Sequence, residues 1–180
     1  MCLRIVSDES MLPKSKLIRF NLENRRLRLY PSGKFFARSH MNGQETKTGC
    51  IWKEVKFNED KDGYYRCNFY IHGVQRNFSQ HRLVYYAYNQ DWNIFDISKD
   101  NIIDHKNRIK TDNTKENLHV VNHQQNCFNT NAKGYYWDPK KKRWRAEIML
   151  DGKKHRLGRF KTEEEARNAY LKKKAEIHII

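Results

Sequence analysis

The sequence lacks the features that mark secreted, membrane-spanning and disulfide-bonded proteins. Its cysteines lie far apart and form no C-x-x-C pair: Cys2, Cys50, Cys67 and Cys127. That spacing disfavours a disulfide framework and a zinc knuckle, and it fits a reduced intracellular compartment. The N-terminus shows no charged segment followed by an apolar one, as a signal peptide would. The longest apolar run, residues 83–88, is far shorter than the ~18 residues of a membrane span.

Acidic residues are also scarce relative to basic ones. The 180 residues contain 36 Lys and Arg against 21 Asp and Glu, for a formal net charge of +15 and a pI near 9.7. The apolar fraction is low at 38%, but 13% aromatic residues argue against a disordered chain. We therefore expect one domain or two small ones, soluble, with nucleic acid as the partner and no membrane.

The positive charge is concentrated at the two ends of the chain. Residues 1–50 carry a net charge of +6 and residues 133–180 carry +8, while residues 51–132 together carry only +1. A surface charged for solubility alone would be more even. We expect the ends to bind phosphate backbone and the centre to hold a different function.

Local patterns before residue 130 predict short strands with few helices. Residues 26–36 are typical of two strands around a turn, and residues 64–79 of a hairpin that turns at His72-Gly73. Residues 81–88 have apolar side chains at helical spacing. A polar joint at 129–133 predicts a domain boundary, with one domain over 1–132 and a second over 133–180.

The last 48 residues predict a small three-stranded antiparallel sheet packed on one helix. Strands are expected at 134–137, 143–150 and 153–160, with Asp151-Gly152 as a hairpin turn. Thr162 and Glu165 form the capping-box pattern at the start of the helix. The fold class predicted for the whole chain is therefore α+β.

Alternation within these strands separates an apolar face from a basic one. Trp144 and Ile148 fall on the face that would pack against the helix, so Trp144 is interpreted as a core residue. The opposite face carries Arg145, Lys154 and Arg156 and is expected to point outward.

The central segment, residues 102–129, carries the residues suited to catalysis. Its pattern predicts a strand, a long loop, a second strand and a helix that begins after Asn122. Asp104 and Asn126 offer hard oxygen ligands of the kind that Mg²⁺ or Mn²⁺ prefers. His105 could take a proton from water near neutral pH. Together these residues predict a phosphodiesterase site with no organic cofactor.

The compound pattern of this segment resembles the HNH endonucleases of phages and mobile introns. The matching residues are Asp104-His105, Asp112-Asn113, Glu116-Asn117-Leu118, Val120-Val121 and Gln124-Gln125-Asn126, preceded by Gly63-Tyr64 and His81-Arg82-Leu83-Val84. The resemblance implies a ββα-metal finger over 102–129, with His105 as general base. It also implies Asp104 and Asn126 as metal ligands and Asn117 as a brace for the loop that orients His105. His81 is a possible supporting residue.

Two positions depart from the family pattern. Asn126 stands where many members have histidine, and it should still bind Mg²⁺ but disfavours a soft metal. Arg108 stands in a turn where the family usually has glycine. Asn tolerates a positive φ better than most residues, so we expect Asn107 to adopt that conformation in its place.

The C-terminal segment resembles the APETALA2 DNA-binding domain, which also occurs fused to HNH nucleases. The matching residues are Lys133–Trp137, Trp144–Ile148, Leu157–Phe160 and Glu163–Tyr170. The resemblance implies a sheet that lies in the major groove of DNA. The residues that it turns toward DNA are Lys133, Tyr136, Arg143, Arg145, Glu147, Lys154 and Arg156.

The sequence thus favours a metal-dependent, homing-type endonuclease of double-stranded DNA, encoded by a phage or other mobile element and monomeric. It would act in the cytoplasm of a bacterial host or in a nucleus. Two alternatives stay open: a DNA-binding regulator whose nuclease finger is inactive, and an RNA-binding module. Cleavage of plasmid DNA separates the first alternative from the enzyme, and competition by single strands tests the second.

Overall fold

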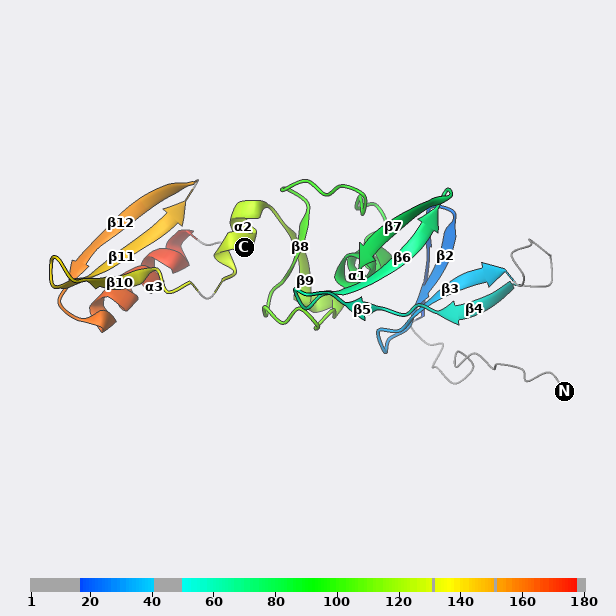
Figure 1. Ribbon diagram of the computed structural model, residues 1–180, viewed down its shortest axis with the longest axis horizontal. Coiled ribbons are helices and arrows are strands. Elements are labelled where there is room, and N and C mark those ends of the chain that lie inside the picture. The colour runs from blue at the N-terminus through cyan, green and yellow to red at the C-terminus, as the bar shows by residue number, and fades with distance from the viewer. Residues whose placement is uncertain (1–16, 41–49, 131, 151, 178–180) are drawn as a thin grey trace. The chain divides into compact units, whose positions relative to one another are not determined.

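The computed structural model describes residues 17–40, 50–130, 132–150 and 152–177 (Figure 1). The chain divides into two compact units. The first comprises residues 1–97 and 105–119, and the second comprises residues 98–104 and 120–180. Each unit is described by itself below.

The first unit opens with a four-stranded antiparallel sheet. Its strands, in order, are β1 (Ile18–Leu22), β2 (Arg25–Leu29), β3 (Phe35–His40) and β4 (Cys50–Glu54). The alternation predicted before the turn is present, since Leu27 and Leu29 are buried on one side of β2. Basic side chains of β2 have structural contacts: Arg25 donates to the carbonyl of Tyr70 at 2.9 Å, and the Arg28 guanidinium lies 3.7 Å from the centre of the Trp52 ring.

A second antiparallel sheet and a helix complete this unit. The sheet has the order β5 (Asn58–Glu59), β6 (Tyr65–Ile71) and β7 (Val74–Ser79), and α1 (Gln80–Tyr88) packs against β6 and β7. The hairpin turns at His72 and Gly73 as predicted, and both have a positive φ, at 48° and 80°. Two-residue turns with this geometry match the twist of the flanking strands.

The central segment has the predicted order of elements. β8 (Ile102–His105) pairs with β9 (Leu118–Val121) after a loop that ends in the 3-10 helix η3 (Lys115–Asn117). We call residues 106–117 the finger loop. α2 (His123–Phe128) follows, and Asn122 caps it by accepting from the backbone N–H of Gln125 at 2.8 Å.

The C-terminal part of the second unit is a three-stranded antiparallel sheet with one helix on it. β10 (Tyr135–Asp138), β11 (Arg143–Leu150) and β12 (Lys153–Phe160) lie in that order, and α3 (Glu163–Ile177) packs on one face, as Figure 1 shows. Buried Ala146, Ile148, Ala166 and Tyr170 form the core, with Trp144 packed against it.

The predicted capping box of α3 is confirmed. The backbone N–H of Glu165 donates to the Thr162 hydroxyl, and the Glu165 carboxylate accepts from the backbone N–H of Thr162, both at 3.2 Å. Of the predicted Asp151-Gly152 turn, Asp151 lies outside the described residues, and Gly152 has a φ of 70°.

Taken together, the small antiparallel sheets and the helices of the described residues are compatible with the predicted α+β class. No helix in the described part of the chain is long and apolar enough to cross a membrane. Cys67 and Cys127 are free thiols, the first buried and the second exposed.

Gly134 allows a close approach between the start of β10 and α3. It has a φ of 67°, and a Cβ built there would overlap the Tyr170 ring. We predict that Gly134→Ala lowers the free energy of unfolding by about 2–4 kcal/mol, because it adds overpacking to an unfavourable φ. Gly152→Ala is the matched control: its φ is 70°, but nothing lies within 4 Å of the added Cβ.

Denaturant unfolding of both variants measures the difference. The control should lose only the ~1–2 kcal/mol that a positive φ costs a side chain. Equal losses in the two variants would mean that Tyr170 does not limit this position.

Candidate functional site

His105 ends β8 and is buried in the first unit, with 3% of its surface exposed. Two other rings surround it. The centre of the His81 ring lies 5.3 Å from that of His105, and the Tyr64 ring lies 6.2 Å from His105 and 5.2 Å from His81. The β5–β7 sheet and α1 therefore supply the wall against which the imidazole packs.

A hydrogen bond to the finger loop determines which nitrogen of His105 carries the proton. Nε2 lies 2.8 Å from Oδ1 of Asn113, and Nδ2 of Asn113 donates to Oε1 of Gln80 at 3.0 Å. With the amide oxygen of Asn113 facing the ring, Nε2 is the donor, since an amide oxygen only accepts, and the neutral ring then has its lone pair on Nδ1. Asn113 thus selects the tautomer that accepts a proton at Nδ1.

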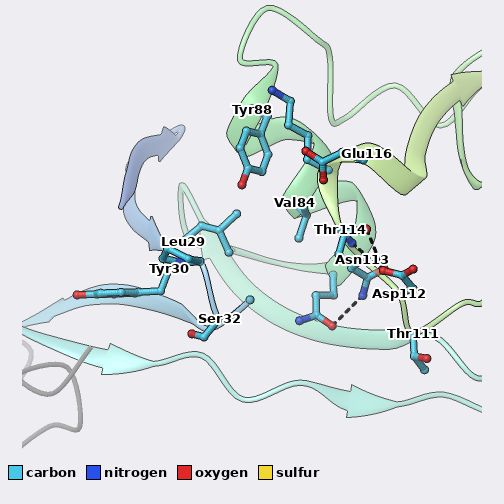
Figure 2. Close-up of a pocket in the computed structure, with 14 residues that line it drawn as sticks. Leu29, Tyr30, Ser32, Val84, Tyr88, Thr111, Asp112, Asn113, Thr114 and Glu116 are labelled. Carbon is cyan, nitrogen blue, oxygen red and sulfur yellow. Dashed lines mark hydrogen bonds between the residues drawn. The ribbon is translucent and has the colours of Figure 1, made fainter. Parts of the chain in front are cut away.

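Asn113 also lines a pocket of about 390 Å³ between the finger loop, α1 and the turn after β2. Figure 2 shows its side chain beside those of Asp112 and Thr114, and Val84 and Tyr88 of α1 also line the pocket. Sequence reasoning noted Asn113 only as part of a motif. Its role depends on Gln80, 33 residues earlier in the chain, and no local pattern signals that contact.

Asn117 holds the two ends of the finger loop together. Its Oδ1 accepts from the backbone N–H of Asn107 at 2.9 Å, and its Nδ2 donates to the carbonyl of Asp112 at 2.7 Å. Its own carbonyl accepts from the backbone N–H of Lys106 at 2.9 Å. Asn117 is buried, with 8% of its surface exposed, so these bonds satisfy groups that water hardly reaches.

The expectation that Asn107 adopts the positive φ of the turn is wrong. Arg108 has a φ of 64°, and Asn107 keeps an ordinary conformation. The physical reason is that the Asn107 side chain is engaged: Oδ1 accepts from the backbone N–H of Ile109, and Nδ2 donates to Asp112 at 2.7 Å. The backbone N–H of Arg108 donates to the carbonyl of His105 at 2.8 Å, which closes the turn.

Two carboxylates near this centre have a lowered pKa. The pKa of Asp112 is held below its usual value by the Thr114 hydroxyl and backbone N–H, helped by Asn107. The pKa of Asp60 is lowered first by the backbone N–H of Tyr64 and then by Arg66. Both side chains thus stay ionised well into acid, and Asp60 holds Arg66 in place.

His81, the possible supporting residue, is buried beside His105 with 9% of its surface exposed. Burial lowers its pKa to about 3, and electrostatic interaction with His105, Arg82 and Arg66 acts in the same direction. His81 is therefore neutral at any pH near 7. Its uncharged ring packs against His105 and does not compete with His105 for a proton.

The two predicted metal ligands lie in the second unit. Asp104 is the residue before His105 in β8, and its Oδ2 accepts from Nδ2 of Asn129 at 2.7 Å. Asn126 lies in α2, where its backbone N–H donates to the carbonyl of Asn122. Within the described ranges, no group of three or more His, Cys, Asp or Glu residues is arranged to hold a metal.

The donor chemistry of this pair still suits a hard cation. Asp104 offers a carboxylate and Asn126 an amide oxygen, and both residues are only partly buried. Mg²⁺ is commonly held by one or two carboxylates while it keeps several waters, so a small set of protein oxygens is enough. A soft ion that prefers sulfur does not fit these ligands.

The predicted DNA-facing side chains of the second unit gather on the sheet face opposite α3. Tyr136 stands across from Arg145, and Glu147 stands across from Arg156. The buried Glu147 carboxylate forms ion pairs with Arg145, with Lys154 at 3.2 Å and with Arg156 at 4.0 Å. Burial alone would raise the pKa of Glu147, but Lys154 and Arg145 outweigh it and hold the pKa below its usual value.

Sequence reasoning missed one residue of this face. The register of β11 and β12 shifts at Ala146 and Glu147, which leaves Leu157 as an extra residue in β12. The bulge puts Arg159 directly across from Arg145, on the same face as Arg156. Strict alternation from Arg156 would place Arg159 on the helix side. The available signal was Gly158, since a glycine inside a strand often marks a bulge.

We call Tyr136, Arg145, Glu147, Lys154, Arg156 and Arg159 the cation face. By register Arg143 shares this face, and it is exposed at the start of β11, across from Asp138. Lys133 has a different partner, because its ammonium lies 3.4 Å from the Glu163 carboxylate at the start of α3.

The lowered pKa of His81 predicts a pH-dependent stability. The unfolded chain protonates this histidine below about pH 6.5, whereas the folded protein resists protonation until about pH 3. The free energy of unfolding should therefore be constant above pH 6.5 with respect to this group. Below it, the free energy should fall by about 1.4 kcal/mol per pH unit.

Denaturant unfolding at pH 7.5 and pH 5.5 measures this loss above the range in which most carboxylates titrate. The His81→Gln variant is the control, and its free energy of unfolding should depend less on pH than that of the wild type. An equal dependence in the two proteins would assign the effect to other groups.

Comparison with known proteins gives a limited likeness. No family model matches the chain, and no curated protein matches it either. The chain is similar to a solved structure that describes DNA binding and cleavage by the HNH homing endonuclease I-HmuI. The two share 27% sequence identity, with a TM-score of 0.39, over 57% of this chain and 50% of that one. The match therefore spans half the length of that protein.

Proposed function

We propose that this protein is a metal-dependent endonuclease of the HNH type that cleaves double-stranded DNA. The observation that carries the proposal is the tautomer of His105. Asn113 accepts a hydrogen bond from Nε2, so the imidazole has its lone pair on Nδ1 and is prepared to take a proton from water. The finger loop that positions Asn113 is itself braced by Asn117.

In this proposal His105 acts as the general base. Its ring accepts a proton from a water molecule at Nδ1, and the water oxygen attacks the phosphorus of the scissile phosphodiester. Tyr64 and the neutral His81 fix the plane of the ring through their contacts with it. Asn117 is a positioning residue, since its side-chain hydrogen bonds go to the backbone of the finger loop.

The ligands proposed for a divalent cation are Asp104 and Asn126. Asp104 directly precedes His105 in β8, so the same strand positions both the proposed metal ligand and the proposed general base. When bound, Mg²⁺ or Mn²⁺ would supply charge stabilisation at the phosphate oxygens. Asn129 holds one oxygen of Asp104 in a fixed orientation through its amide N–H.

The cation face is proposed to dock on DNA. Arg145, Lys154, Arg156 and Arg159 offer ammonium and guanidinium groups on one surface, and the exposed ring of Tyr136 lies among them. A two- or three-stranded sheet fits the major groove of DNA. The buried Glu147 holds three of the cations and is proposed to orient them rather than to contact DNA.

Further parts of the proposal rest on the family resemblance. The protein would be a monomeric, homing-type enzyme of a phage or other mobile element. It would nick one strand, because one His105 centre per chain cuts one strand. It would work in the cytoplasm of a bacterial host or in a nucleus, where its DNA substrate is found.

A second candidate is a DNA-binding regulator with an inactive finger. The observation in its favour is that His105 exposes only 3% of its surface, which limits the access of water and phosphate to the ring. The cation face lies in a different unit and would bind DNA in either case.

Plasmid cleavage separates the two candidates. We predict that the wild type with Mg²⁺ converts supercoiled plasmid to nicked or linear DNA, and that His105→Ala lowers the rate at least ~100-fold, because general-base catalysis contributes that much. His105→Ala should still retard DNA in a gel, and EDTA should stop cleavage by the wild type. Retardation without cleavage by the wild type, over a range of metals and sequences, would favour the regulator.

The cation face generates a second prediction. Arg159→Ala and Arg156→Ala should each weaken duplex binding and lower the slope of log K against log salt by about 0.9, since each removes one phosphate contact. The matched control is Arg167→Ala, which removes the same charge from an exposed position of α3. Fluorescence anisotropy at several salt concentrations gives both quantities. If all three variants bind alike, the effect is one of net charge and the cation face is not the docking surface.

A further inference from the structure

Three arginines line a pocket of about 330 Å³ in the first unit, apart from the cation face. Arg66 comes from β6, Arg76 from β7 and Arg82 from α1, and Ser79 and Phe95 complete the walls. None of the residues that line the pocket is acidic. We call it the arginine pocket. The segment around it, residues 51–100, has almost no net charge, so composition does not signal it.

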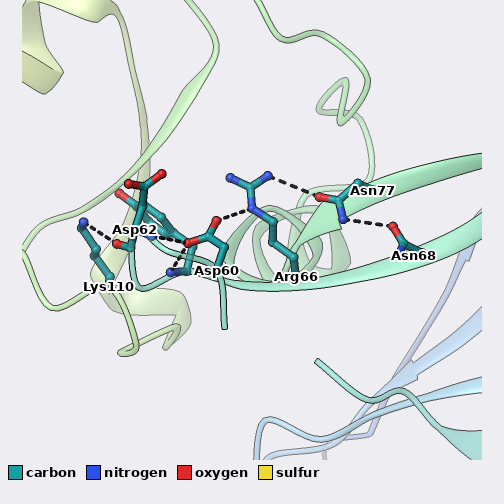
Figure 3. Close-up of polar contacts among 7 residues, drawn as sticks. Asp60, Asp62, Arg66, Asn68, Asn77 and Lys110 are labelled. Carbon is teal, nitrogen blue, oxygen red and sulfur yellow. Dashed lines mark hydrogen bonds and ion pairs between the residues drawn. The ribbon is translucent and has the colours of Figure 1, made fainter. Parts of the chain in front are cut away.

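Two of these arginines are held in place by the protein. Figure 3 shows Arg66 between Asp60, with which it forms an ion pair, and Asn77, to which it donates at 3.3 Å. The Arg82 guanidinium donates to the carbonyls of Ile94 and Asp96 at 2.8 and 2.7 Å. These bonds fasten the segment after α1 as one wall of the pocket, and they leave Arg66 and Arg82 with fixed positions.

Arg76 differs from the other two. It is exposed, and its guanidinium lies 5.4 Å from the centre of the Phe95 ring. Within the described residues its side chain makes no hydrogen bond or ion pair, although its backbone pairs with β6. A guanidinium that rests on an aromatic face and has no carboxylate partner is suited to bind an oxyanion.

The start of α1 favours an anion at the same place. Ser79 is the N-cap residue and lines the pocket; it has 7% of its surface exposed, and its side chain makes no capping hydrogen bond. The first turn of α1 contains no acidic residue. No acidic side chain of the helix therefore neutralises the positive end of its dipole. This end and the three guanidinium groups all attract an anion in the pocket.

The apolar side of the pocket points to a nucleotide rather than a bare ion. Phe95 lies beside Arg76, and Ile97 exposes 89% of its surface at the rim. A sugar or base can pack on such side chains while its phosphate meets the guanidinium groups. A pocket for inorganic phosphate alone would not need this apolar rim.

We propose that the arginine pocket binds a phosphate ester of the DNA strand, with Arg76 and Ser79 as the groups that contact it. The inference rests on the proposed function in that it assigns the ligand to DNA. Ser79 pairs with Arg66 across β6 and β7, and His81, two residues after Ser79, packs on His105. The pocket is therefore built on the same hairpin and helix against which the His105 ring packs, and the phosphate held here anchors the strand that His105 cleaves.

The test measures binding without metal, so cleavage is not needed. Fluorescence anisotropy with a labelled duplex in EDTA, at 50–200 mM salt, should give an Arg76→Ala affinity roughly three- to tenfold below the wild type. The slope of log K against log salt should be smaller by about 0.9. Arg76→Lys should keep most of the slope. Lys53→Ala, which removes an exposed cation of β4 outside the pocket, is the control and should bind like the wild type.

Two further arms identify the source of the phosphate. Titration with a thymidine dinucleotide should shift the NMR signal of the Arg76 Nε–H, whereas inorganic phosphate at the same concentration should not. A stronger response to inorganic phosphate would overturn the assignment to DNA, and an Arg76→Ala slope equal to that of Lys53→Ala would overturn the site. A protein that binds the dinucleotide at Arg76 but never cuts DNA would contradict the proposed function and leave this inference standing.

Discussion

The hydrogen bonds of two asparagine side chains carry the geometry on which the proposed chemistry depends. The finger loop has few backbone hydrogen bonds of its own, because it is neither strand nor helix over most of its length. Asn117 ties its two ends together, and Asn113 connects it to both His105 and Gln80. An amide accepts through its oxygen and donates through its nitrogen, so each asparagine satisfies partners that an ionised carboxylate, which only accepts, could not satisfy. The position and the tautomer of His105 both follow from these bonds.

The same principle orders the cation face. Long basic side chains lose much conformational freedom when they bind, and a protein that holds them beforehand reduces that loss. Glu147 does this for three of them from a buried position in β11. Its carboxylate subtracts one unit of charge from the surface and in exchange gives the remaining cations defined directions. A surface of unconstrained lysines would have a higher positive charge, but its side chains would have no defined orientation.

A count of charged residues by segment does not reveal the arginine pocket. The middle of the chain is nearly neutral when counted by segment, yet the arginine pocket lies within it. Acidic side chains nearby, such as Asp60, serve as partners that orient guanidinium groups and do not themselves line the pocket. Neutrality in sequence therefore conceals a local positive site, because the fold separates the two signs in space.

The sequence by itself determined much of the local structure. Alternation predicted the hairpin at 64–79 and the strands β11 and β12, and the T-x-x-E pattern predicted the start of α3, since these signals act between residues close in the chain. It also indicated which types of residue could do chemistry in the central segment. The assignment of Asp104 and Asn126 to a metal stays a prediction.

Only the tertiary structure decided which groups meet. The bulge at Leu157 moved Arg159 to the cation face, and the bond from Asn113 to Gln80 joined segments 33 residues apart. The positive φ fell on Arg108 because the Asn107 side chain was already bonded to Asp112. These outcomes depend on which groups compete for the same hydrogen-bonding and packing partners in the folded protein. The order of residues along the chain does not show which groups compete.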